Sequence, residues 1–165
     1  MTYEAPHRDI DARIYTSAGW IKGSFRLPQL HGLIDHLDHS GPFLRLAGVV
    51  VPGLEKPCAA MALRRNAAIV ILPMGDEDEL QLRTTVADTV GHRVSCILHA
   101  GVVSGVLASL RHVNPTDFLI HHPGFILLRD CHIFVRGERE RGGPFPLVIV
   151  NAARVVAVSG EPMEK

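Results

Sequence analysis

The chain has 165 residues, of which 47% are hydrophobic and 21% are charged. This composition is typical of a globular protein and excludes a disordered or collagen-like chain. Lys+Arg and Asp+Glu both number 17, so the formal net charge is zero and strong nonspecific binding to nucleic acid is not expected.

The first predicted unit covers residues 13–73 and follows a polar segment, 1–12, that we expect to be flexible. Strands are predicted where β-branched and apolar residues alternate or cluster, at 13–17, 20–27, 43–51 and, as a closing pair, within 61–73. Gly23 lies inside the second of these strands, which predicts a sharp bend or a close backbone approach. Asn66 predicts a tight turn between the closing strands, because asparagine tolerates positive φ.

The second predicted unit covers residues 93–160, after an acidic linker at 74–92 and before a flexible C-terminus at 161–165. Its strands are predicted at 93–99, 102–110, 125–135 and, as a closing pair, within 145–158. Gly105 and Asn151 take the places of the interior glycine and of the turn asparagine. In both units a long loop precedes the third strand, at 27–42 and 111–124, and predicts one helical turn, which Asn114 or Thr116 caps in the second unit.

The two units align when the chain is shifted by 82 residues. The shift superimposes Gly23 on Gly105 and Asp35 on Asp117, with further identities between residues 18 and 46. A further shift of three residues then brings Asn66 onto Asn151. Identities in one order, with matching apolar positions between them, predict a tandem duplication.

The order of predicted elements resembles the Sm-like family, which includes the Sm proteins and bacterial Hfq. IKGSF and VSGVL resemble the bent second strand of the first Sm motif, Asp35 and Asp117 resemble the aspartate that follows it, and LRRNAAIVIL resembles the second motif. The Gly-to-Asp spacing is longer here than in that family, and its Met-Asn pair is missing. The resemblance implies an all-β fold of two tandem five-stranded, strongly bent small barrels, each with a short helical turn in a loop.

Candidate site residues follow from the repeat and from the resemblance. Asp35 and Asp117 are expected to stabilise their helical turns, and a role in accepting hydrogen bonds from a ligand is the alternative. The resemblance implies that loop residues around a ring pore contact RNA. The candidate nucleic-acid-binding residues are His39, Arg64, Arg65, Asn66, Arg111, His121 and Asn151.

Other chemistry has little support in the sequence. No motif of a hydrolase, a P-loop or a dinucleotide-binding fold occurs, so we expect neither catalysis nor a cofactor. The His-x-x-His pair at His36 and His39 lacks a compact set of further ligands, and no metal is expected; a metal-dependent enzyme is the weakest alternative. Cys96 and Cys131 lie in apolar strand patterns and are expected to be buried and inert. An odd number of cysteines and the lack of a signal-peptide core predict a soluble cytoplasmic protein.

The sequence therefore predicts a ring-forming or scaffold module that acts through protein partners, including copies of itself. Two units per chain favour a trimer that gives a pseudo-hexameric ring. The alternative is an Sm-like RNA-binding protein that uses the loop histidines and arginines. No contact with a membrane is expected.

Overall fold

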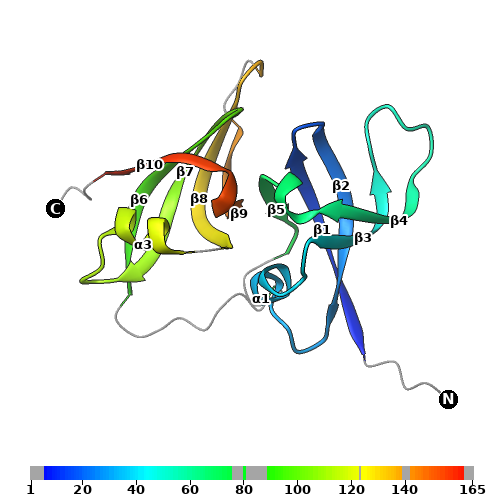
Figure 1. The fold of residues 1–165 in the computed structure, drawn as a ribbon, viewed down its shortest axis with the longest axis horizontal. Coiled ribbons are helices and arrows are strands. Elements are labelled where there is room, and N and C mark those ends of the chain that lie inside the picture. The colour runs from blue at the N-terminus through cyan, green and yellow to red at the C-terminus, as the bar shows by residue number, and fades with distance from the viewer. Residues whose placement is uncertain (1–5, 76–79, 81–88, 123, 139–141, 162–165) are drawn as a thin grey trace. The chain divides into compact units, whose positions relative to one another are not determined.

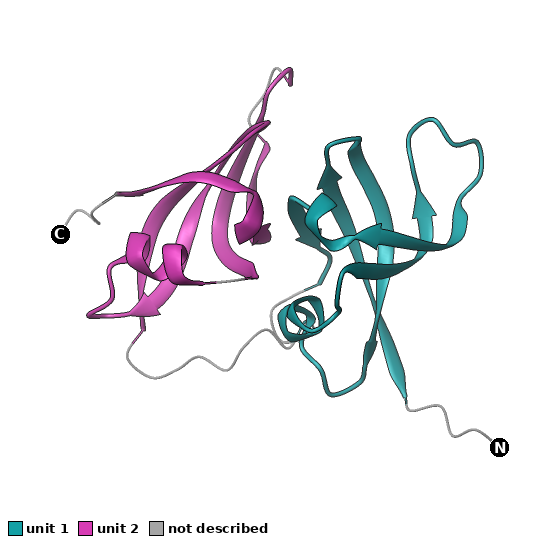
Figure 2. Cartoon of the chain, in the orientation of Figure 1, with its two compact units in different colours: residues 1–84 teal, residues 85–165 magenta. Residues whose placement is uncertain are grey.

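The structure is a computed structural model that describes residues 6–75, 80, 89–122, 124–138 and 142–161. The chain forms two compact units, residues 1–84 and 85–165 (Figure 2). Both are built mainly from antiparallel strands, and each contains one short α-helix (Figure 1). None of the helices in the described ranges has the length and apolar character needed to cross a membrane.

The first unit has five strands in the spatial order β5-β1-β2-β3-β4. In chain order its elements are β1 (His7–Thr16), β2 (Gly19–Pro28), α1 (Leu33–Asp38), β3 (Phe43–Val50), β4 (Cys58–Arg64), the 3₁₀ turn η1 (Arg65–Ala67) and β5 (Val70–Pro73). The long loop between β2 and β3 contains α1, as the sequence predicts.

The second unit repeats this arrangement in the order β10-β6-β7-β8-β9. Its elements are β6 (Thr89–Leu98), β7 (Gly101–Leu110), α3 (Pro115–His121), β8 (Phe125–Val135), β9 (Gly142–Asn151), the 3₁₀ turn η2 (Ala152–Arg154) and β10 (Val155–Glu161). The first four elements start 82 residues after their counterparts, and β10 starts 85 residues after β5. The two offsets are those of the sequence repeat.

The core of each unit comes from the inward side of its strands. In β1, Ile10, Ala12 and Ile14 are buried, whereas the residues between them face outward. Phe25 on β2 and Phe125 on β8 are the largest fully buried side chains. Burial of one such ring contributes about 2–3 kcal/mol relative to its exposure.

Gly23 and Gly105 mark equivalent irregularities in the two sheets. The β2–β3 register shifts between Lys22 and Ser24, and the β7–β8 register shifts between Ser104 and Val106. A Cβ at Gly23 would lie 3.0 Å from the Val49 side chain, and one at Gly105 would lie 2.5 Å from the Cys131 sulfur. The prediction of a close backbone approach at both glycines is therefore confirmed.

The two helices begin differently. Asn114 caps α3 by accepting a hydrogen bond from the Thr116 amide at 2.9 Å, which confirms one of the two predicted caps. Gly32 occupies the N-cap of α1 and provides no side-chain cap. Asp35 and Asp117 lie in the first turns of their helices, where a carboxylate favours the helix dipole.

The structure corrects the prediction that each unit is a closed barrel. In the described residues no pairing joins the end strands β5 and β4 of the first unit, or β10 and β9 of the second. Each unit is an open five-stranded sheet. Closure requires hydrogen bonds between end strands, and here the chain passes between those strands through a 3₁₀ turn instead.

Several predicted boundaries also change. Strand β1 starts at His7 rather than at residue 13, and β6 starts at Thr89 within the predicted linker. The turns near Asn66 and Asn151 are 3₁₀ turns without positive φ at either asparagine. The acidic run 76–79 and the predicted C-terminal segment after residue 161 lie outside the described residues.

Candidate functional site

The candidate residues of the first unit gather where the end of α1 meets η1. The Arg65 guanidinium donates a hydrogen bond to the Asp38 backbone carbonyl at 3.1 Å and lies 3.6 Å from the Asp38 carboxylate. His39 follows directly and caps α1, with its backbone N–H and its ring Nδ1 near the Asp35 carbonyl. Arg65 thus connects the helix to the turn, which is a structural role.

Arg64 and Asn66 flank Arg65 and are both exposed. The Arg64 guanidinium lies over the Phe43 ring, 5.3 Å from its centroid, as in a cation–π contact. Arg64, Asn66 and His39 therefore remain accessible around one end of the first unit.

The matching candidates of the second unit are not arranged in the same way. Asn151 is 2% exposed, and its side-chain oxygen accepts a hydrogen bond from the Ala153 amide, so it caps η2. His121 ends α3, and Arg111 follows β7; both are exposed. Val150 and Ile120 stand where the repeat places counterparts of Arg65 and Asp38, so no equivalent ion pair forms there.

The outer strands β4 and β10 form a second candidate region. Strand β4 pairs with β3 and strand β10 pairs with β6, and neither has a second neighbour among the described residues. Charged residues are absent from β4 until Arg64 and from β10 until Glu161, and neither strand contains proline. Lysine, proline and other charged residues normally protect such edges from association, so both edges are open to strand pairing.

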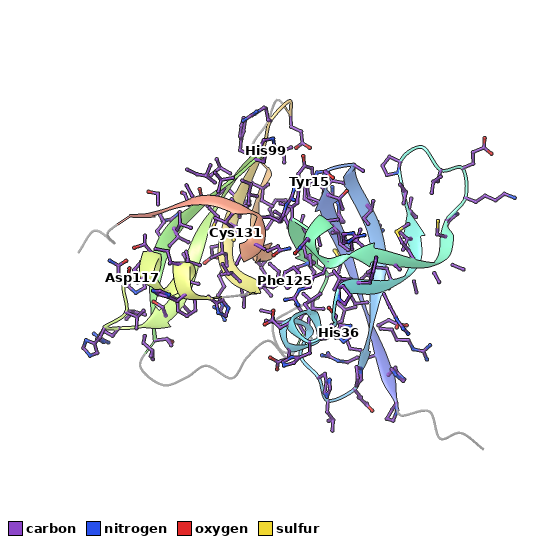
Figure 3. All side chains as sticks on the ribbon, viewed as in Figure 1. Tyr15, His36, His99, Asp117, Phe125 and Cys131 are labelled. Atoms are coloured by element: carbon purple, nitrogen blue, oxygen red, sulfur yellow. The ribbon has the colours of Figure 1, made fainter. Side chains whose placement is uncertain are left out.

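A pocket of about 500 Å³ lies in the first unit, between the outward side of β2 and β3 and the helix α1. Its lining includes Arg26, Arg45, His7, His36 and Phe43. Burial and the neighbouring His31 lower the pKa of His36, whose position on α1 Figure 3 shows. Sequence reasoning missed the two arginines, because only the strand register brings them together.

Two of the three thiols are buried and unreactive. Cys96 and Cys131 are fully buried, and burial raises their pKa values to about 11 and about 12 respectively. The prediction of buried thiols is confirmed for both. Within the described ranges no group of three or more His, Cys, Asp and Glu side chains is placed to hold a metal.

Thiol labelling tests this assignment. At pH 8 a disulfide-exchange reagent is expected to modify only Cys58 rapidly in the native protein, because the buried thiols stay protonated. All three cysteines react in guanidinium chloride. Cys58→Ser is the control, and fast labelling of that variant in native buffer would contradict the assignment.

Comparisons with protein-family models, with curated protein sequences and with solved structures find no match to this chain. The fold and its surfaces therefore provide the structural evidence for a function.

Proposed function

We propose that the protein is a self-associating, Sm-like scaffold module without catalytic activity. The observation that carries the proposal is the pair of unprotected edge strands, β4 in the first unit and β10 in the second. An uncharged edge strand presents a row of backbone donors and acceptors that a strand of another chain can satisfy.

Different edges at the two ends of the strand order favour head-to-tail association. A contact between β4 of one copy and β10 of the next is heterologous, and it closes into a ring when the rotation per copy allows. A trimer would contain six similar units. The order of a strand, a glycine-containing strand, an aspartate loop, a strand and a closing pair in each unit supports the Sm-like assignment.

Light scattering coupled to size exclusion tests the proposal. One chain has a mass of 18.0 kDa, so a trimer is expected at about 54 kDa. A ring gives one mass over a wide range of concentrations, whereas an open filament grows with concentration. A constant mass of one chain would overturn the proposal.

RNA binding is the second candidate function, and the accessible Arg64, Asn66 and His39 around one end of the first unit support it. The engagement of Arg65 with Asp38 and the burial of Asn151 argue against a ring of identical RNA sites. Fluorescence anisotropy with U-rich and A-rich RNA at moderate salt separates the two functions. Binding that Arg64→Ala weakens would favour RNA.

A further inference from the structure

We propose that the pocket between α1 and the outward side of β2 and β3 binds a nucleoside phosphate. The site is independent of the edge strands and lies entirely within the first unit. Its volume of about 500 Å³ falls within the range of small-molecule sites.

The positive charge of the pocket comes from two neighbouring strands. Phe25 on β2 pairs with Leu46 on β3, and both side chains are buried. Because side chains alternate along a strand, Arg26 and Arg45 face outward side by side. Like charges at such positions repel each other unless an anion lies between them.

No carboxylate neutralises these arginines in the described part of the chain. Asp9 is the partner of Arg26 in the β1–β2 register, but the ion pair recorded within 4.0 Å is that of Arg65 with Asp38. The two guanidinium groups are therefore available for a phosphate, which arginine binds through paired hydrogen bonds.

The rest of the lining suits the non-phosphate part of such a ligand. His7 and His36 add ring nitrogens, and Ser40 adds a hydroxyl that can bond a sugar. Phe43 is 44% exposed and provides an aromatic surface for a base. The pocket thus combines cations, hydrogen-bonding groups and an exposed ring.

The second unit provides an internal comparison. At the positions of Arg26, Arg45 and His36 the repeat has Ala108, Leu127 and Phe118. The ring at the position of Phe43 is Phe125, which is 1% exposed (Figure 3). The same fold therefore forms without these charges, and their presence in the first unit is not a requirement of the sheet.

The limited extent of the charge favours a mononucleotide over a long polyanion. A protein that binds many phosphates is usually clearly basic, whereas this chain has a formal net charge of zero. One pocket with two arginines matches one phosphate group or a diphosphate.

Isothermal titration of the full chain with ADP tests the site, with adenosine, pyrophosphate and a short oligoadenylate RNA as comparison ligands. The double variant Arg26→Ala/Arg45→Ala is expected to weaken ADP binding at least about tenfold. Lys22→Ala/Arg93→Ala removes the same charge at exposed positions outside the pocket and should leave the affinity unchanged. Phe43→Leu should weaken ADP but not pyrophosphate. Circular dichroism confirms that each variant is folded.

Four results would overturn the proposal. These are no ADP binding at millimolar concentration, equal losses in the pocket and control variants, adenosine binding as tight as ADP, or pyrophosphate binding as tight as ADP. If oligoadenylate binds more than about tenfold more tightly than ADP, the site is an RNA site and the mononucleotide assignment is wrong.

Discussion

Two lysines on each outer strand are expected to stop self-association without unfolding the chain. Ala60→Lys/Ala62→Lys places them on β4, and Ala157→Lys/Ser159→Lys places them on β10. All four side chains are exposed, so the fold tolerates the longer residues. Lysine on an edge strand opposes pairing with another strand, because pairing would crowd and partly desolvate the charges.

The two variants together identify the edges in contact. Each keeps one intact edge, so each should be a monomer alone, and an equimolar mixture should form a dimer through the remaining β10 and β4 edges. Light scattering at about 20 µM measures both outcomes, a concentration at which even a micromolar contact forms. If the contact joined two copies of β4, the β10 variant would still dimerise alone and mixing would add nothing.

A matched control separates edge chemistry from total charge. Leu30→Lys/Leu54→Lys also adds two positive charges, at side chains that are 89% and 53% exposed in turns. This variant should keep the mass of the unmodified protein. Loss of association in the control as well would show that charge alone disperses the assembly.

The strands and the repeat could largely be predicted from the sequence, because both depend on local patterns. Alternation of apolar residues located the strands, and the two offsets matched the starts of the elements. The start of β1 was predicted too late, because Asp9 and Asp11 gave the segment a polar character. These charges face outward while Ile10 and Ala12 are buried, and pairing with β2 along its whole length extends the strand to His7.

Long-range features could not be predicted in the same way. Five strands per unit are compatible with an open or a closed sheet, and the choice depends on pairing between end strands. The pocket depends on Arg26 and Arg45, which are distant in the sequence and adjacent only through the β2–β3 register. The irregularity at Gly23 sets that register, and the sequence pattern marks the glycine without giving the size of the shift.

Gly105→Ala is expected to destabilise the protein far more than Gly23→Ala does. The new methyl at residue 105 would lie 2.5 Å from the Cys131 sulfur and 3.0 Å from the Arg129 carbonyl oxygen, so the backbone of β8 has to move. At residue 23 its nearest neighbour is the Val49 side chain at 3.0 Å, which can rotate. We expect losses in the free energy of unfolding of about 3 kcal/mol and about 1 kcal/mol, measured by guanidinium denaturation of the full chain.

Removal of the sulfur tests whether the contact with Cys131 causes this loss. Cys131→Ala alone leaves a small cavity and costs about 1–2 kcal/mol. In the double variant Gly105→Ala/Cys131→Ala the new methyl occupies part of the space that the sulfur leaves, so the combined loss should be smaller than the sum of the two. The contact with the Arg129 carbonyl persists, so recovery should be partial. Strictly additive losses would mean that the backbone contact, and not the thiol, determines why residue 105 is glycine.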